Sequence, residues 1–293
     1  MTEILDKTKE NLYSRQIGTY GNDAMKKIMN LKILILGLKG LGIEVAKNII
    51  LTGPEKIIIY DPNIVNLKDL GLNYYLNEND INKNRIDYSC INSLSKLNPF
   101  TNVEILEVTG KNNFYESLDK NKLDVIVETE LISQKELISI NEYCRKKKIK
   151  FIYGANLGLE GFIFSDFGGE HIIYDIDGED PKRYMIKDIP NEENGKIIIE
   201  EEESNNQFNL TEGDYILFKN VKGMVELNDN KPRKIEKLED NIIYINDNTK
   251  NYHKYEGNGD IYEYKSTTKM NYISYEDSIK LPFKKTEEKQ NFT

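Results

Sequence analysis

A glycine-rich turn after an apolar run is the first place where this sequence could do chemistry. Residues 31–36 are followed by GLKGLG, residues 37–42, and then by a helical pattern. In a working dinucleotide or ATP fingerprint the order is GxGxxG, and the second glycine lets the backbone approach the phosphates. Here Lys39 occupies that second-glycine place, and its side chain should block a close approach. The turn therefore predicts either a working nucleotide site or a fold whose site has degenerated. The glycines concerned are Gly37, Gly40 and Gly42.

Asp61 is the second candidate for nucleotide chemistry. It comes directly after another buried strand pattern, residues 56–60. In the dinucleotide-binding fold an acid at this place binds a ribose hydroxyl. An aspartate at a strand end also serves as a turn residue or as the partner of a helix dipole, and we favour that structural interpretation.

The sequence offers few residues for metal or thiol chemistry. Its cysteines and histidines are far apart and form no CxxC pattern; they are Cys90, Cys144, His171 and His253. This excludes a Cys/His zinc cluster and a disulfide scaffold, and we expect no metal site. Both cysteines lie in apolar helical patterns, where free thiols are usually inert, so we expect no catalytic residue in this chain.

Charge divides the chain. Of its 293 residues, the first 166 hold 22 Lys/Arg and 22 Asp/Glu, so the whole net charge of −9 lies after them. We expect a domain over 1–166, a second over 167–285 and a polar tail over 286–293. The acidic charge excludes a general nucleic-acid binder. No apolar run reaches 18 residues and the charged N-terminus lacks a signal-peptide core, so we expect no membrane partner and a cytoplasmic and nuclear location.

Strand and helix patterns alternate through the first half. Helical spacing follows the glycine turn and recurs over 79–97 and 133–147, the last opened by Ser133 and Glu136 at the capping-box spacing. Such alternation predicts a Rossmann-like α/β fold, a mostly parallel sheet with helices on both faces. The apolar runs that predict its buried strands are residues 31–36, 56–60, 103–106, 123–127 and 150–153.

The helical period disappears after Phe164. Seven short strand-like segments follow, the first at residues 170–174 and the last at 271–275, with turn signals such as Gly257–Asp260 between them. Short strands at this spacing predict a small all-β barrel or sandwich. We therefore expect a small β domain after the α/β domain.

Two stretches identify a family. Residues 12–61, which begin LYSRQIGTYG and contain ILGLKGLG, closely resemble the N-terminal, inactive adenylation half of the ubiquitin-activating enzyme, a ThiF-type fold. The match continues through residues 77–85 and 158–170. Residues 212–235, EGDYILFKNVKGMVELNDNKPRKI, resemble that enzyme's first catalytic-cysteine half-domain, a β-barrel inserted in the α/β domain. The resemblance covers nearly the whole chain and identifies it as an N-terminal fragment of such an enzyme.

The resemblance implies an activity that this chain does not carry out alone. Members of the family are ligases that adenylate the ubiquitin C-terminus with ATP and Mg²⁺, form a ubiquitin thioester on a cysteine and pass it to a conjugating enzyme. Two adenylation halves pack together in the family, and only the second binds ATP. This chain lacks the second half, so we expect it to be inactive by itself and to hold no ATP or Mg²⁺ tightly. Its implied partners are that second half, ubiquitin and the conjugating enzymes.

Position by position, the resemblance implies a degenerate nucleotide site that does not bind. In working halves an arginine contacts the ATP phosphates where this chain has Leu72. Arg85 matches a lysine of the family, which keeps the charge but not the geometry. Leu131 falls where an aspartate should hold Mg²⁺, although two glutamates precede it. Lys39, Leu72 and Leu131 thus remove phosphate approach, phosphate charge and the metal ligand.

Arg15, within LYSRQ, is the residue to which the resemblance assigns chemistry. It implies a helix that crosses to the other adenylation half, where the matching arginine reaches the ATP phosphates. A guanidinium offers planar, paired donors to phosphate oxygens and stabilises the charge that develops as pyrophosphate leaves. Leu12, Tyr13 and Ile17 would form the packing face of this helix. The alternative for Arg15 is a surface arginine that pairs with a nearby acid.

Two other functions remain open. One is a regulatory subunit of a heterodimeric activating enzyme for a ubiquitin-like protein, although the GMVELN stretch favours the ubiquitin type. The other is a stand-alone nucleotide-binding Rossmann enzyme, an oxidoreductase or adenylyltransferase. That function predicts NAD or ATP binding by the isolated chain, and the substitutions in the nucleotide site argue against it.

Overall fold

A computed structural model of the chain describes residues 7–86, 88–108, 114–176, 178–200 and 210–281. The chain forms two compact units, Met1–His171 with Asn271–Thr293 and Ile172–Met270, so the first unit takes up residues from both ends. The expected polar tail, 286–293, lies outside the described residues. No helix in the described part of the chain is long and apolar enough to cross a membrane.

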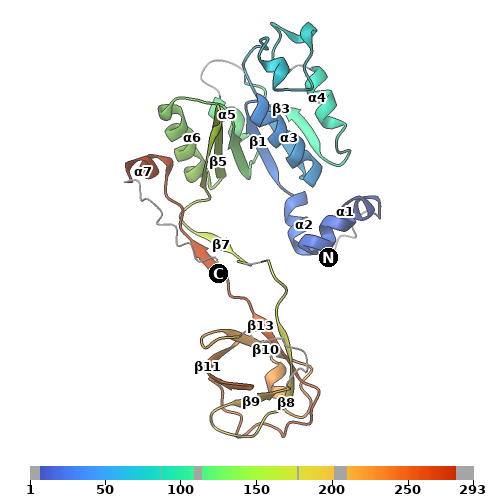
Figure 1. The fold of residues 1–293 in the computed structure, drawn as a ribbon, viewed down its shortest axis with the longest axis vertical. Coiled ribbons are helices and arrows are strands. Elements are labelled where there is room, and N and C mark those ends of the chain that lie inside the picture. The colour runs from blue at the N-terminus through green and yellow to red at the C-terminus, as the bar shows by residue number, and fades with distance from the viewer. Residues whose placement is uncertain (1–6, 87, 109–113, 177, 201–209, 282–293) are drawn as a thin grey trace. The chain divides into compact units, whose positions relative to one another are not determined.

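The first unit is built on a six-stranded sheet with the order β3-β2-β1-β4-β5-β6 (Figure 1). Strands β1 to β5 are parallel, and β6 runs antiparallel beside β5. The strands are β1 Lys32–Leu36, β2 Lys56–Tyr60, β3 Asn102–Ile105, β4 Val125–Glu128, β5 Lys150–Leu157 and β6 Glu160–Asp166. The predicted Rossmann-like fold is confirmed. The chain reverses its winding between β1 and β4, and ligands of such folds bind beyond the carboxyl ends of these strands.

Helices cover both faces of this sheet. One face carries α3 (Gly40–Thr52) and α4 (Tyr88–Ser95), and the other carries α5 (Phe114–Asp119) and α6 (Gln134–Lys147). Side chains of β1 alternate between them, because successive residues of a strand point to opposite faces. Ile33 and Ile35 pack with α3, whereas Leu34 and Leu36 pack in the core beneath α6. The continuous apolar run is therefore buried on both sides.

The predicted capping box of α6 is confirmed. The Glu136 backbone N–H donates to the Ser133 hydroxyl at 3.3 Å, and the Ser133 backbone N–H donates to the Glu136 carboxylate at 3.0 Å. Each side chain thus satisfies a backbone donor that the first helical turn leaves free.

The helix expected over residues 79–97 is wrong in its first part. Residues 78–80 form a short 3-10 turn, η2, and the α-helix begins only at Tyr88. The Asn79 backbone N–H donates to the Asn77 side chain at 3.0 Å, and the Asn77 N–H donates to Asp80 at 2.9 Å. Short polar side chains therefore take backbone donors that a longer helix would use.

The second unit is a closed barrel with the order β10-β11-β12-β9-β8-β13, in which neighbouring strands are antiparallel. Its core is made of buried apolar side chains, among them Ile197, Ile216, Ile235, Ile243 and Ile261. The predicted all-β barrel is confirmed, although its strand β8 was not among the predicted segments. The strands are β8 Arg183–Asp188, β9 Lys196–Ile199, β10 Tyr215–Lys219, β11 Arg233–Glu239, β12 Ile242–Ile245 and β13 Asp260–Tyr264. A separate two-stranded sheet pairs β7 (His171–Ile173) with β14 (Thr268–Met270).

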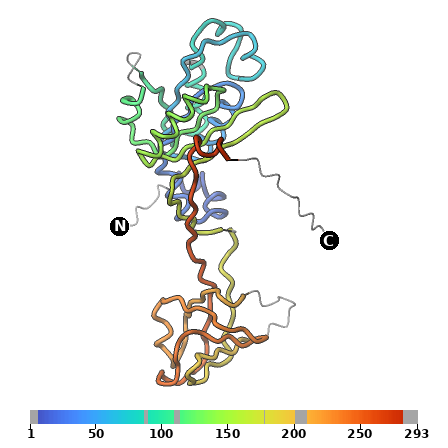
Figure 2. Tube along the Cα trace, turned by 90° about the vertical axis from the view of Figure 1, so that its left-hand side faces the viewer, coloured from blue at the N-terminus to red at the C-terminus, as the bar shows by residue number. Residues whose placement is uncertain are grey.

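The strand expected over residues 271–275 is wrong, because residues 271–274 form neither strand nor helix and Tyr275 begins the helix α7 (Tyr275–Lys280). The hydroxyl of Ser274 caps its first turn. The ring of Tyr275 packs edge-on against Phe164 with the centroids 5.1 Å apart. This helix lies beside α6 in both views (Figures 1 and 2), so packing on the first unit decides the conformation of this segment.

Candidate functional site

The glycine turn connects β1 to α3. Gly37 has a φ of +88°, and its N–H donates to the Tyr60 carbonyl at 2.9 Å. A Cβ on Gly42 would lie 2.1 Å from the Gly37 carbonyl oxygen, so the helix packs directly on the turn. Lys39 precedes α3 and its side chain is exposed. Gly37 and Gly42 are thus required by the backbone itself, whether or not a ligand binds.

Asp61, directly after β2, is fully buried and is satisfied by donors of this chain. Its Oδ2 accepts from the Leu38 N–H at 2.8 Å and from Arg85 Nη1 at 2.7 Å. Its Oδ1 accepts from the Asn63 N–H at 2.9 Å. The carboxylate therefore holds the glycine turn and Arg85 in place.

Arg85 is buried and pairs with three carboxylates, so we call it the buried hub. Its side chain is 5% exposed, and besides Asp61 it contacts Glu130 Oε1 at 2.9 Å and Asp69 Oδ2 at 3.4 Å. Burial opposes its positive charge, but the three carboxylates outweigh burial and raise the pKa of Arg85 above its usual value. Asp69 opens the short 3-10 turn η1 (Asp69–Gly71). The guanidinium therefore links β2, this turn and the loop after β4.

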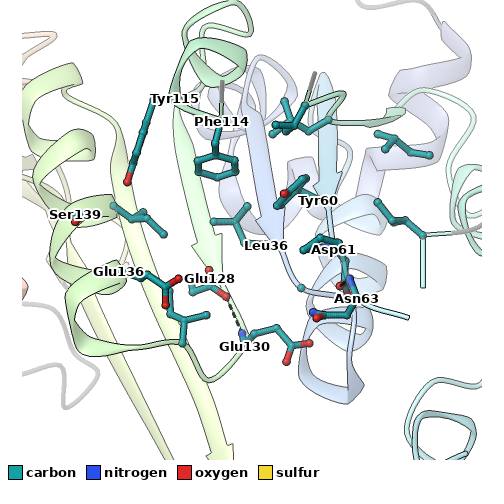
Figure 3. A pocket seen from close by; sticks show the side chains of 18 of the residues that line it. Leu36, Tyr60, Asp61, Asn63, Phe114, Tyr115, Glu128, Glu130, Glu136 and Ser139 are labelled. Atoms are coloured by element: carbon teal, nitrogen blue, oxygen red, sulfur yellow. Dashed lines mark hydrogen bonds between the residues drawn. The ribbon is translucent and has the colours of Figure 1, made fainter. Parts of the chain in front are cut away.

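Two glutamates lie at the carboxyl end of β4, Glu128 as its last residue and Glu130 in the loop that follows. Glu128 is 3% exposed, and its Oε1 accepts from the Glu130 N–H at 2.8 Å (Figure 3). Burial, together with the nearby charges of Glu130 and Asp61, raises the pKa of Glu128 to about 8. Burial also raises the pKa of Glu130, and Arg85 opposes that rise. Acidic groups thus occupy the carboxyl edge where the fold family receives phosphates.

Leu72 and Leu131 lie at the same edge. Leu72 stands over the start of α3, because a Cβ on Gly40 would lie 3.3 Å from the Leu72 Cβ. Leu131 lies in the loop between β4 and α6 and is 56% exposed. Neither side chain can donate a hydrogen bond to phosphate or ligate a cation.

A cavity of about 1060 Å³ opens beside these residues. Aromatic rings of Tyr60, Phe114 and Tyr115 form part of its wall. Carboxyl groups enter it from the end of β2, from the end of β4 and from α6 (Figure 3). The acidic lining residues are Asp61, Glu128, Glu130 and Glu136.

Arg15 lies far from this edge. It is an exposed residue of α1 (Lys7–Tyr20), and its guanidinium makes no hydrogen bond or ion pair with any described residue. Two positions before it, Tyr13 packs against Gly53 at the carboxyl end of α3. The glycine turn is at the other end of α3, whose 13 residues span about 20 Å. Arg15 therefore takes no part in the edge formed by the glycine turn, Asp61 and Arg85.

Comparison with known proteins assigns the first part of the chain to a protein family. The sequence profile of the ThiF family matches residues 13–194, which is more than half of the chain. The chain belongs to the ThiF family. A second profile, that of the ubiquitin-activating enzyme E1 FCCH domain, matches residues 193–265, most of the barrel.

Full-length relatives of this ThiF chain are much longer than it is. It is 34% identical over 276 residues to "Ubiquitin-activating enzyme E1 2" of Arabidopsis thaliana, covering 93% of this chain and 25% of the relative. It is 34% identical over 273 residues to "Ubiquitin-like modifier-activating enzyme 1" of Homo sapiens, with the same two coverages. It is 35% identical to "Ubiquitin-activating enzyme E1 1" of Schizosaccharomyces pombe, with 93% and 26% covered. The chain thus spans about a quarter of the length of these curated relatives.

The switch point of this ThiF unit does not fit ATP with Mg²⁺. Its cavity presents four carboxyl groups against the single ammonium of Lys135, and the Arg85 guanidinium is already bound to carboxylates. A phosphate chain would meet like charges and would lack a paired donor. Within the described ranges, no group of three His, Cys, Asp or Glu side chains is arranged to hold a metal ion.

Sequence reasoning identified most positions at this ThiF edge but missed how they connect. The structure brings together the glycine turn, Asp61, Arg85 and Leu72, and leaves Arg15 apart. It also adds Asp69, which the sequence did not single out. Three acids converge on one arginine from separate segments, and no local pattern signals such convergence.

Proposed function

We propose that this chain is the non-catalytic N-terminal part of a ubiquitin-activating enzyme, which in full adenylates ubiquitin and passes it to a conjugating enzyme. The names of its relatives and the FCCH match support the family activity. In this proposal the ThiF unit is a scaffold for a second adenylation half, and ATP and Mg²⁺ belong to that half.

One observation carries the proposal. At the unit's own switch point Asp61 is already paired with Arg85, while Arg15 is exposed about one helix length away and free of described partners. A guanidinium that is held on a helix and left without a carboxylate is suited to bind phosphate oxygens on another domain. In this proposal the chain has no working nucleotide site of its own. It supplies the Arg15 guanidinium to the nucleotide site of the second adenylation half.

Exposed apolar side chains around the degenerate edge support docking of a protein there. Strand β5 continues from Tyr153, the partner of Glu128, to Leu157, so the β5–β6 hairpin projects beyond the sheet edge. Leu157 and Ile163 on this hairpin are exposed, as are Leu72 and Leu131. A group of exposed apolar side chains of this kind is typical of a protein–protein interface.

Calorimetric titration of the isolated chain tests the first half of the proposal. ATP with Mg²⁺, and NAD separately, should give no binding heat, because the acidic edge repels phosphates. Tight binding of either nucleotide would instead favour the stand-alone nucleotide-binding enzyme.

Pyrophosphate exchange by the longer natural protein tests the second half. Arg15→Ala should slow ATP–pyrophosphate exchange by about 100-fold or more, the usual effect of losing one donor to developing charge. Lys7→Ala removes an exposed cation from the same helix and is the matched control. An unchanged rate for Arg15→Ala at limiting ATP would refute the assigned role.

A further inference from the structure

Helix α1 is attached to the ThiF unit through Tyr13, its one buried residue in the described part of the chain. The ring lies on Gly53, which has a φ of +86° and where a Cβ would come within 2.4 Å of the Tyr13 hydroxyl. The ring also faces Phe100, with the centroids 6.4 Å apart, and Asn98 contacts its hydroxyl. We call Tyr13, Gly53, Asn98 and Phe100 the α1 anchor.

The amide of Asn98 is held in one orientation. Its Nδ2 donates to the Ile50 carbonyl at 2.8 Å, and its Oδ1 accepts from the Phe100 N–H at 3.1 Å. The same amide meets the Tyr13 hydroxyl at 2.8 Å from Nδ2 and at 3.1 Å from Oδ1. Asn98 is 3% exposed, so losing one partner would leave a buried polar group unsatisfied.

The anchor also determines which way Arg15 faces. Arg15 comes two residues after Tyr13, and two residues rotate a helix by about 200°, so the two side chains leave opposite sides of α1. Burying Tyr13 against α3 therefore turns Arg15 away from the unit, where its side chain is exposed.

Helix α1 depends on this contact for its order. It has 14 residues, and isolated helices of this length are marginal in water. Its exposed residues include Leu12, which was expected to pack, so the helix buries little apolar surface of its own. Docking through Tyr13, together with packing against α2 (Asn22–Met29), supplies stability that its own sequence lacks.

We propose that Tyr13 and Asn98 are positioning residues that hold α1 so that Arg15 is presented at a fixed place to the phosphates bound by the second adenylation half. The inference rests on the proposed function of Arg15. It adds that the hydrogen bond between the Tyr13 hydroxyl and the Asn98 amide fixes the position from which Arg15 contacts the phosphates.

Hydrogen exchange of the 293-residue chain provides the first test. Tyr13→Phe keeps the ring but removes the hydroxyl, and Asn98→Asp keeps the acceptor but removes the amide donor. Each should speed exchange of the α1 amides by about 10- to 100-fold. Tyr255→Phe is the matched control, because that hydroxyl donates to the Ile186 carbonyl at 2.8 Å in the barrel core. It should leave α1 unchanged.

Kinetics of the longer protein provide the second test. Tyr13→Phe should lower kcat/KM for ATP in pyrophosphate exchange by about 10-fold or more, because small misplacement of a catalytic group is costly. In the Arg15→Ala background the same change should have less than about twofold effect, since the group it positions is already absent. Tyr13→Ala, which also loses the ring, should be slower than Tyr13→Phe, and Tyr255→Phe should match the parent.

The outcomes separate the two claims. If Arg15→Ala does not slow ATP–pyrophosphate exchange, the proposed function fails and the positioning role fails with it. If Arg15→Ala slows it and Tyr13→Phe does not, only the positioning role is refuted. Unchanged α1 amide exchange in both anchor variants, or equal losses from Tyr13→Phe with and without Arg15, would also overturn it. Faster α1 exchange with a loss that requires Arg15 supports it.

Discussion

Arg85 and Asp61 form an ion pair that is almost closed to solvent, with 2.7 Å between Nη1 and Oδ2 and side chains 5% and 0% exposed. Asp61 in turn accepts from the Leu38 N–H, so the pair fastens the glycine turn from below. In an ordinary dinucleotide fold the turn and the acid face a ligand. Here the guanidinium of Arg85 binds the carboxylate of Asp61 instead.

This pair predicts the first stability effect. Arg85→Ala should destabilise the first unit by about 3–5 kcal/mol, because it leaves buried carboxylates without their counter-charge. Urea unfolding followed by far-ultraviolet circular dichroism measures it, since the described α-helices lie in that unit. Lys83→Ala removes a neighbouring lysine whose side chain is 53% exposed, and should change the midpoint little. Equal effects of the two variants would contradict the buried hub.

Glu128 predicts a pH dependence with a definite sign. Its pKa is raised to about 8 in the folded chain, while an unfolded glutamate titrates near 4.3. Between these values the folded state binds more protons, so stability falls as pH rises, by at most about 1.4 kcal/mol per pH unit from this group. Glu128→Gln should remove that slope and gain stability relative to the parent towards pH 8.

Unfolding curves taken between pH 5 and 8 check the prediction for Glu128. Glu136→Gln is the control, because hydrogen bonds from Ser133 lower the pKa of Glu136. That group loses its stabilising charge only in more acidic solution and adds no slope in this range. The prediction is wrong if the parent and Glu128→Gln show the same dependence on pH.

The glycine turn predicts opposite outcomes for two neighbouring glycines. Gly42→Ala places a Cβ 2.1 Å from the Gly37 carbonyl oxygen, which is backbone, so we expect a loss of about 1–3 kcal/mol or more. Gly40→Ala places a Cβ 3.3 Å from the Leu72 Cβ and 3.6 Å from the Leu72 carbonyl oxygen, contacts that a shift of a few tenths of an ångström at this half-exposed residue relieves. It should unfold close to the parent midpoint. Thermal unfolding of both variants decides, and similar losses would argue against close packing at Gly42.

The cysteines predict an absence of thiol chemistry in the native chain. Cys90 and Cys144 are buried, and burial raises the pKa of the Cys144 thiol to about 12. A thiol that stays protonated is a poor nucleophile. A chromogenic disulfide reagent should therefore leave both thiols unreacted in buffer and titrate two in urea. Rapid reaction of one thiol in buffer would reopen the question of a catalytic cysteine here.

The sequence by itself determined the fold class and most of its elements. Apolar runs such as residues 32–36 are long enough to be buried on both faces, and only a sheet covered by helices on both sides provides that environment. Local capping chemistry was also readable, as Ser133 and Glu136 show. Where side chains competed with the backbone, as at Asn77, or where distant packing acted, as at Tyr275, the predicted elements were wrong.

Only the tertiary structure decided how the residues around the glycine turn are connected. The three acids around Arg85 lie 16, 24 and 45 residues from it along the chain, so their convergence depends on how β2, η1 and the loop after β4 come together. The contact of Tyr13 with Asn98 spans 85 residues and likewise has no local signature. Residue types can show which donors and charges a chain possesses. Which of them neutralise one another and which stay exposed, as Arg15 does, depends on distances that only folding sets.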